Sequence, residues 1–331
     1  MTAGQKPLPL DDIYQSIQTD LQDVEIRLRE IASSSNPLIA EVNRYLFQKG
    51  GKRIRPALLI LSAKLCGYSG AEHVFWSALV EIIHTASLIH DDIVDNSTLR
   101  RGQDTVHAKW GANISVLLGD YLYIQSIALA LKTKIYPIID LLADVTAAMV
   151  EGELIEFSVN GQAELSEEVY LEILDKKTAA LFSCACRIGG LLAGIPPGRE
   201  KKLHEFGTSL GLAFQIVDDL LDFKGEEKAM GKPVLSDFRE GRITLPLIHA
   251  VRAARGSDRT RLVELIENRK TRPDAPQQVR DIVLASGCLD SAYDRATDYV
   301  RKAKESLAEF PAAEPRRSLE RIADLVLQRN A

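Results

Sequence analysis

Two groups of aspartate residues share the spacing D-D-x-x-D. The six aspartates are Asp91, Asp92, Asp95, Asp218, Asp219 and Asp222. Each group lies where apolar residues recur at helical spacing, and residues three or four positions apart share one face of a helix. Carboxylates on one face repel one another unless water or a cation neutralises them. Clusters made only of oxygen ligands suit Mg²⁺, which takes one or two carboxylates together with substrate phosphates. We therefore expect the two groups to face each other and to hold a polyphosphate through bridging Mg²⁺ ions.

The segment that carries the second aspartate group also carries two glycines. Gly207, Gly211 and Gln215 precede these aspartates on the same helix face. A glycine inside a helix costs about 1 kcal/mol relative to alanine, so we expect a compensating role, such as leaving room for a ligand. Before the first group, His84 begins a polar stripe that ends in the carboxylates. A solvated acidic surface is the alternative interpretation, although chance occurrence of both groups has odds of about one in two hundred.

Positively charged residues that could bind an anionic substrate lie near chain breaks and near the aspartates. The candidates are Lys52, Arg53, Arg55, Arg100, Arg101, Lys176, Lys177 and Lys232. Arginine suits bidentate phosphate contacts, whereas lysine acts as a point charge. Taken singly, each is more often a solvated surface charge, but their joint occurrence favours phosphate binding. The sequence contains neither a P-loop nor a dinucleotide-binding glycine pattern.

Helical spacing of apolar residues extends along nearly the whole chain, and repeated strand patterns are absent. Turn-forming residues interrupt this spacing at short breaks, which are Gly50-Gly51, 67–70, Asn160-Gly161, 194–198, Lys224-Gly225 and 272–276. None of these breaks resembles a flexible linker between domains. We expect one all-α domain over residues 1–331, built from about ten to twelve helices in a bundle.

The composition excludes several classes of protein. The 331 residues carry 41 basic and 46 acidic side chains, so the net charge of −5 gives no reason to expect a nucleic-acid partner. The four cysteines are too few and too scattered for a disulfide framework, and we expect them to be reduced and buried. The N-terminus does not read as a signal peptide, and no apolar run is long enough to span a membrane. We expect a cytoplasmic protein without stable membrane insertion.

In this order, the motifs resemble those of the trans-isoprenyl diphosphate synthases, which form the polyprenyl synthetase family. The likeness runs from Gly50 to Pro246 and covers GGKRIRP, EIIHTASLIHDDIVDNSTLRRG, the KKT at 176–178, GLAFQIVDDLLDF and GKPVLSDFREGRITLP. It implies an all-α bundle of the isoprenoid synthase type around a deep central cavity, usually as a homodimer. The core motifs would occupy 50–246, and helices of 255–331 would pack on that core.

The resemblance also implies a role for each matching residue. The six aspartates would bind Mg²⁺, with roughly three ions per active site. The diphosphate of isopentenyl diphosphate would contact Lys52, Arg55, His84 and Arg101. The allylic diphosphate would contact Arg100, Lys177, Thr178, Gln215 and Lys232. The catalytic residues would be Asp91, Asp95, Asp218, Lys177 and Lys232.

The implied reaction is the stepwise addition of isopentenyl diphosphate to an allylic diphosphate. Loss of diphosphate from the allylic substrate gives a cation, which the double bond of isopentenyl diphosphate attacks before a proton is lost. In the family, residues just before the first aspartate help to set product length. Here Ala86 and Ser87 are small, whereas Ile83 lies one turn deeper. We expect a medium or long product, hexaprenyl to decaprenyl, and geranylgeranyl or farnesyl diphosphate is the alternative.

Three residues depart from the family pattern. Leu235 replaces a frequent glycine, Arg242 a frequent lysine, and Glu156 the glutamine of a GExxQ pattern. A terpene cyclase is one rival interpretation, but the second aspartate group is a complete DDLLD and GGKRIRP is present. A non-catalytic metal-binding subunit is another, and it would be expected to have lost part of an aspartate group or its basic partners.

Overall fold

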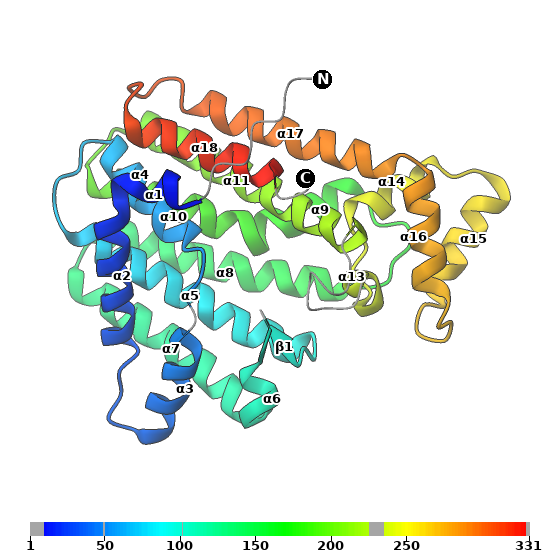
Figure 1. Cartoon of the computed structure of the whole chain (residues 1–331), viewed down its shortest axis with the longest axis horizontal. Helices are drawn as coiled ribbons and strands as arrows, with labels where there is room; N and C mark the ends of the chain where they lie inside the picture. The colour runs from blue at the N-terminus through cyan, green and yellow to red at the C-terminus, as the bar shows by residue number, and fades with distance from the viewer. Residues whose placement is uncertain (1–9, 49, 101, 225–234, 329–331) are drawn as a thin grey trace. The chain divides into compact units, whose positions relative to one another are not determined.

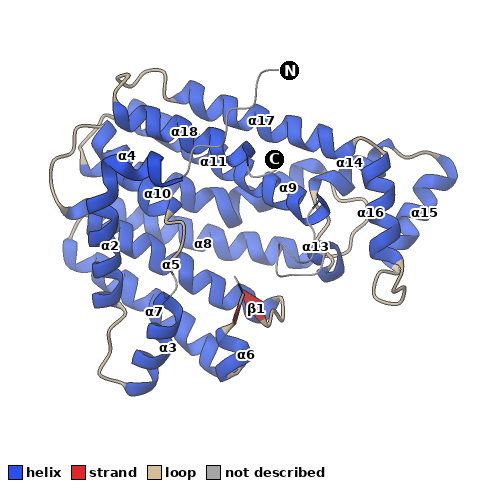
Figure 2. Ribbon diagram, in the orientation of Figure 1, coloured by secondary structure: helices blue, strands red, loops and turns tan. Residues whose placement is uncertain are grey.

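The computed structural model describes residues 10–48, 50–100, 102–224 and 235–328. Helices make up nearly all of the regular structure in these residues (Figures 1 and 2), which confirms the prediction of an all-α protein. The helices are more numerous than expected because several are short connecting turns. Two strands of two residues each, β1 (Leu99–Arg100) and β2 (Gln103–Asp104), form an antiparallel hairpin that the helical pattern did not predict.

The chain groups into two compact units, and each is described by itself. Unit 1 contains residues 1–146, 181–207 and 304–322, and unit 2 contains residues 147–180, 208–303 and 323–331. The expected single domain, its central cavity and the packing of residues 255–331 on a common core therefore stay predictions.

The elements of unit 1 lie mostly in the first half of the chain. They are α1 (Leu10–Tyr14), η1 (Gln15–Ile17), α2 (Gln18–Ile31), α3 (Pro37–Gln48), α4 (Ile54–Leu65), α5 (Glu72–Val94), β1, β2, α6 (Val106–Trp110), α7 (Ala112–Thr133) and most of α10 (Ala180–Leu192). Helix α5 packs against α2, α4 and α7, and Figure 1 shows α5 and α7 side by side. Apolar residues surround α5 on most sides, as expected for a central helix. A Cβ atom on Gly189 of α10 would lie 2.6 Å from the Leu59 carbonyl oxygen of α4, so glycine permits close contact between these two helices.

The elements of unit 2 begin after residue 146. They are α9 (Glu167–Leu174), the π-helical turn η2 (Asp175–Ala179), α13 (Ser236–Glu240), α14 (Leu245–Ala253), α15 (Gly256–Glu267), α16 (Ala275–Ala285) and most of α17 (Cys288–Ser306). Besides α10 and α17, three helices contain residues of both units, namely α8 (Tyr136–Ser158), α11 (Pro197–Lys224) and α18 (Glu314–Gln328). Helix α9 begins where the Ser166 hydroxyl accepts the Val169 N–H, a typical N-cap.

The predicted breaks fall between helices or at helix ends wherever the structure describes them. Gly67, Gly161 and Gly194 have φ angles of 80°, 76° and 66°, a conformation that glycine adopts without steric cost.

Helix α7 is long and apolar. Its length and composition would allow it to cross a membrane. This was not expected, because the sequence has no unbroken apolar run of membrane-spanning length. Core helices of soluble proteins satisfy the same criterion, and α7 packs on α5 and α6.

Candidate active site

Most of the predicted residues lie in two groups, one in each unit, and each group is called a half-site of the expected active site. The first half-site contains His84, Asp91, Asp92, Asp95 and Arg100 of unit 1. Helix α5 positions the histidine and the first two aspartates and ends at Val94, so Asp95 is its C-cap residue. The Asp95 N–H donates to the Asp91 carbonyl oxygen at 2.8 Å. His84, Asp91 and Asp95 are partly exposed, as expected for residues that receive a ligand.

Asp92 differs from the other two aspartates because it is buried and paired with an arginine. Its side chain is 8% exposed. Both Nε and Nη2 of Arg100 lie 2.8 Å from Asp92 Oδ1. Arg100 is the last residue of β1 and lies eight residues after Asp92 in the chain. Arg100 was predicted to contact the allylic diphosphate and Asp92 to bind metal, but here they bind each other.

A pocket of about 110 Å³ lies beside this pair within unit 1. Three predicted site residues, His84, Asp92 and Arg100, help to line it. Two further charged residues, Arg53 and Glu81, also line the pocket and form an ion pair at 2.7 Å. Arg53 pairs in addition with Glu25 at 2.5 Å, so its charge is already balanced by two carboxylates.

The other cations of the GGKRIRP segment have different surroundings. Lys52 is exposed, and its carbonyl oxygen accepts a hydrogen bond from the Tyr14 hydroxyl at 3.1 Å. The guanidinium carbon of Arg55 lies 4.6 Å from the centroid of the Phe182 ring, a cation–π contact with a fully buried side chain. Arg55 is therefore held at the start of α4 by stacking.

The residues predicted to set product length lie on two faces of α5. Ile83 and Ala86 are each 2% exposed and belong to the core of unit 1. Ser87 is partly exposed, and its hydroxyl donates to the His84 carbonyl oxygen at 2.9 Å. Ser87 therefore shares the face of the polar stripe, whereas the other two do not.

The second half-site contains Lys177, Thr178, Gln215, Asp218, Asp219 and Asp222 of unit 2. Helix α11 carries the glutamine and the aspartates, and η2 carries Lys177 and Thr178. Asp218 is partly exposed, whereas Asp219 and Asp222 are 4% and 6% exposed. The same D-D-x-x-D spacing thus places two of three carboxylates inside the protein.

A chain of hydrogen bonds fixes Asp219. The Thr178 hydroxyl donates to Gln215 Oε1 at 3.0 Å, and Gln215 Nε2 donates to Asp219 Oδ1 at 3.0 Å. The Tyr170 hydroxyl donates to Asp219 Oδ2 at 2.6 Å. Burial and then the charge of Asp237 raise the pKa of Asp219 well above its usual range, against the effect of these hydrogen bonds. Burial and then Asp219 also raise the pKa of Tyr170, so the hydroxyl stays a donor.

Asp222 is fixed by the start of α13. Its Oδ1 accepts hydrogen bonds from the Ser236 N–H and hydroxyl, both at 3.0 Å, and its Oδ2 accepts the Asp237 N–H at 3.1 Å. Burial and then the charge of Asp237 raise the pKa of Asp222 to about 6. Arg242 balances Asp237, with Nη2 2.7 Å from Asp237 Oδ1. The arginine that departs from the family pattern therefore has a structural partner.

The π-helical turn η2 places its lysines against acidic residues of α8. Lys177 Nζ lies 2.7 Å from Glu153 and 2.5 Å from Glu156. Lys176 Nζ lies 2.7 Å from Glu151. Gly152 allows this approach, because a Cβ atom there would lie 2.9 Å from the Lys177 nitrogen. Glu156 replaces the glutamine of the family pattern and makes a direct contact with a predicted catalytic lysine.

The interpretation of the two glycines in α11 was wrong. A Cβ atom on Gly207 would lie 2.5 Å from the Ser183 Cα atom, and one on Gly211 would lie 2.5 Å from the Ala179 Cα atom. Both glycines therefore permit close contact between backbones and leave no room for a ligand. Each residue and its neighbour belong to the same unit.

Two predicted residues, Arg101 and Lys232, lie outside the described residues. Tyr170, Glu81 and Glu153 were not predicted to be parts of either half-site. Their contacts come from other elements, and no local pattern marks them. Asp237 could have been noticed, because it lies in the SDFREG segment of the resemblance.

Within the part of the chain that the structure describes, no three acidic, histidine or cysteine side chains form a preformed metal site. The oxygen donors of the two half-sites nevertheless fit Mg²⁺, which usually takes one or two carboxylates from the protein and completes its shell with water and phosphate.

Known proteins resemble this chain over most of its length. The polyprenyl synthetase family model matches residues 36–283. An octaprenyl diphosphate synthase of Haemophilus influenzae is 36% identical over 98% of both chains. A geranylgeranyl diphosphate synthase of Saccharolobus solfataricus is 34% identical, with 96% of this chain and 98% of the relative covered.

A solved structure agrees with the fold. The crystal structure of a polyprenyl synthase from Caulobacter crescentus, complexed with calcium and isoprenyl diphosphate, superposes with a TM-score of 0.93. It is 36% identical and covers 99% of this chain and all of its own. The matched range contains both aspartate groups and most of the basic residues of the two half-sites, so the chain belongs to the polyprenyl synthetase family.

Proposed function

We propose that this protein is a Mg²⁺-dependent trans-prenyltransferase that lengthens an allylic diphosphate with isopentenyl diphosphate to a medium or long all-trans product. The observation that carries the proposal is the family match over residues 36–283, which includes both aspartate groups. An octaprenyl diphosphate synthase among the relatives supports the product class. The test is release of diphosphate from farnesyl and isopentenyl diphosphates, with and without Mg²⁺. No release in the presence of Mg²⁺ would favour the non-catalytic subunit.

The protein contacts narrow the proposed metal ligands. Asp92, Asp219 and Asp222 are buried and accept hydrogen bonds from Arg100, Tyr170 and Ser236, among other donors. We propose that these three mainly order the half-sites, and that the partly exposed Asp91, Asp95 and Asp218 hold Mg²⁺. When bound, Mg²⁺ would supply positive charge that stabilises the departing diphosphate by several kcal/mol.

The cations of the chain bind and orient the two diphosphates. Arg100 is held by Asp92, and Lys177 is held by Glu153 and Glu156, so each cation is positioned before a substrate arrives. Such preorganised charge favours a transition state in which negative charge develops. We propose that Arg100, Lys177, Thr178 and Gln215 contact the allylic diphosphate, and that Lys52, Arg55 and His84 contact isopentenyl diphosphate. Arg101 and Lys232 keep the roles that the resemblance implies.

Product length is a finer proposal. The small residues Ala86 and Ser87 favour a tail that extends beyond farnesyl length, whereas Ile83 would shorten it. Relatives with octaprenyl and geranylgeranyl names have nearly equal identity, so similarity does not separate these outcomes. Chromatographic sizing of products made with labelled isopentenyl diphosphate tests the proposal. A product no longer than farnesyl would overturn it.

We also propose that the protein is a cytoplasmic homodimer that pairs through α7. Three of its apolar residues, Leu117, Ile124 and Leu131, are 65%, 64% and 53% exposed. A second copy would cover them, whereas a membrane is the alternative occupant. Light scattering of Leu117→Asp/Ile124→Asp should report a monomer, with Ile26→Asp, at an exposed residue of α2, as the matched control. Detergent-dependent solubility of the wild type would favour the membrane instead.

A further inference from the structure

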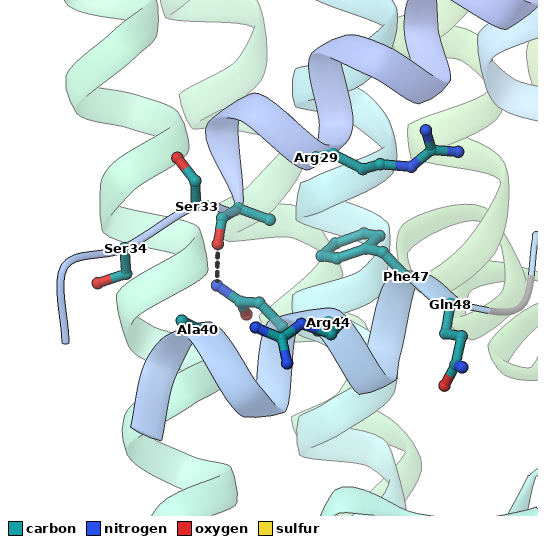
Figure 3. Close-up of a pocket in the computed structure, with 9 residues that line it drawn as sticks. Arg29, Ser33, Ser34, Ala40, Arg44, Phe47 and Gln48 are labelled. Atoms are coloured by element: carbon teal, nitrogen blue, oxygen red, sulfur yellow. Dashed lines mark hydrogen bonds between the residues drawn. The ribbon is translucent and has the colours of Figure 1, made fainter. Parts of the chain in front are cut away.

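A second pocket in unit 1 lies between α2 and α3, apart from the predicted site residues. Its volume is about 360 Å³, and the residues that matter here are Arg29, Ser33, Ser34, Asn43, Arg44 and Phe47. Figure 3 shows the labelled arginines and Phe47 around it, with the two serines at the turn between the helices. We call this the α2–α3 pocket.

Two arginines of the pocket lack the ion pairs that their neighbours make. Arg27 contacts Glu30 at 2.8 Å, and Arg53 contacts Glu25 at 2.5 Å. Among the described residues, neither Arg29 nor Arg44 has an ion-pair or hydrogen-bond partner. Two exposed guanidinium groups on separate helices therefore line one cavity.

The pocket also offers hydrogen-bond donors and acceptors of known direction. The Ser33 hydroxyl donates to the Glu30 carbonyl oxygen at 2.6 Å, so its oxygen can still accept. The Ser34 oxygen accepts the Asn36 N–H at 3.1 Å, so its proton can still be donated.

Asn43 adds a buried acceptor. Its Nδ2 donates to the Ala32 carbonyl oxygen at 2.6 Å, drawn as the dashed line in Figure 3. Its Oδ1 accepts no hydrogen bond within the described part of the chain, although the side chain is only 2% exposed. A buried acceptor without a donor is costly, and a ligand hydroxyl that reached it after a small side-chain movement would remove that cost.

Phe47 gives the pocket an apolar wall that it shares with the first half-site. The same phenylalanine lines both the α2–α3 pocket and the smaller pocket beside Asp92 and Arg100. Phe47 therefore borders both pockets within the same unit.

From these groups we propose that the α2–α3 pocket binds a phosphate monoester of a small polyol. A phosphate monoester carries about −1.5 to −2 charges at pH 7, which matches two arginines better than a single carboxylate does. Its hydroxyl groups would donate to Ser33 and Asn43, and the Ser34 hydroxyl would donate to a phosphate oxygen. The cavity lies within the usual size range of small-molecule sites, roughly 300–1,000 Å³.

The test is calorimetric titration of the full-length protein with glycerol 3-phosphate in phosphate-free buffer. Arg29→Ala and Arg44→Ala should each weaken binding roughly tenfold or more, because each removes a charge-assisted contact. Inorganic phosphate should bind more weakly than glycerol 3-phosphate because it lacks the hydroxyl arms. Arg252→Ala, at an exposed arginine of α14, is the matched control and should bind like the wild type.

Two further arms separate competing explanations. Lys52→Ala should bind glycerol 3-phosphate like the wild type. Loss of binding in this variant would mean that glycerol 3-phosphate occupies the proposed substrate site. A lipid headgroup is the other source of this chemistry, so sedimentation with phosphatidylcholine vesicles, with and without phosphatidic acid, distinguishes it from a soluble ester. Equal affinity of wild type, Arg29→Ala and Arg44→Ala for both probes, or no binding of either probe, would overturn the proposal. Circular dichroism confirms that each variant is folded.

Discussion

The two D-D-x-x-D groups have the same spacing and similar helix positions but opposite surroundings. Both lie near the C-terminal end of a helix, α5 or α11, where the helix dipole disfavours negative charge. In the first group one aspartate is buried, against Arg100. In the second group two are buried, and Tyr170, Gln215 and the start of α13 donate hydrogen bonds to them.

This difference indicates that the D-D-x-x-D motif specifies which ligands a group can bind, but not which of its aspartates are buried and which are accessible to a ligand. An aspartate that accepts two or three hydrogen bonds from its own protein contributes to folding. A partly exposed aspartate contributes mainly when a ligand is present. We therefore expect substitutions in the first group to change activity more than stability, and substitutions around the second group to change both.

The largest expected effect is on turnover. Asp91→Ala and Asp218→Ala should each lower kcat by roughly 100-fold or more, because several kcal/mol of charge stabilisation would be lost. If both half-sites serve one transition state, the double variant should lose less than the product of the single losses. Steady-state assays of diphosphate release measure both quantities. Asp140→Ala, an exposed aspartate of α8, is the control.

Two results would break this assignment. Near-normal turnover of Asp91→Ala would remove the first group from the mechanism. Fully multiplicative losses in the double variant would mean that the two groups contribute independently and do not act as one unit.

The next effect is on stability. Tyr170→Phe removes the hydroxyl that donates to buried Asp219, and the free energy of unfolding should fall by about 1.5–3 kcal/mol. Urea denaturation followed by circular dichroism in Mg²⁺-free buffer measures it. Tyr293→Phe, a tyrosine without such a bond, should change stability by at most about 0.5 kcal/mol. Asp95→Ala, in the first group, should also change the free energy of unfolding by at most about 0.5 kcal/mol. A decrease as large as that of Tyr170→Phe would mean that the two groups do not differ in their contribution to stability.

The sequence predicts the local elements well and the contacts between distant segments of the chain poorly. Apolar spacing and glycine turns indicated the helices, and the aspartate spacing indicated which helices carry the chemistry. The partners of buried charges come from distant segments, as when Arg53 meets Glu25 and Glu81, and no local pattern marks such pairs. For the same reason the glycines of α11 were assigned to a ligand, although the backbone of Ser183 or Ala179 lies against each.

A smaller effect, a difference of about 1 kcal/mol between two substitutions, concerns a residue with left-handed backbone near each group. Asn96 has φ 51°, which asparagine tolerates, whereas Leu235 has φ 59° and is 1% exposed. The Leu235 turn presents the Ser236 and Asp237 N–H groups to Asp222. Leu235→Ala should lower the free energy of unfolding by about 2–5 kcal/mol, because the packing of the leucine side chain is lost.

Leu235→Gly loses the same packing but relieves about 1 kcal/mol of backbone strain. The glycine variant should therefore be more stable than the alanine variant in urea denaturation, the reverse of the usual order. The opposite order would show that the turn relaxes when the side chain is removed. The same pair of substitutions at Asn96 provides the comparison in the first group.

The smallest expected effect tests how tightly the second half-site holds its lysine. Lys177 forms ion pairs with Glu153 and Glu156, and Glu156→Gln removes one of them. The positive charge of Lys177 should then be less neutralised. The KM for the allylic diphosphate should then fall about two- to fivefold, a change of roughly 0.5–1 kcal/mol, because Lys177 still contacts Glu153. The KM for isopentenyl diphosphate should not change, because its proposed contacts Lys52, Arg55 and His84 lie in unit 1. Glu151→Gln, which acts on the neighbouring Lys176, is the matched control. Equal changes in both KM values would mean that Glu156 positions the whole site, and a rise in the allylic KM would mean that Glu156 is needed to aim Lys177.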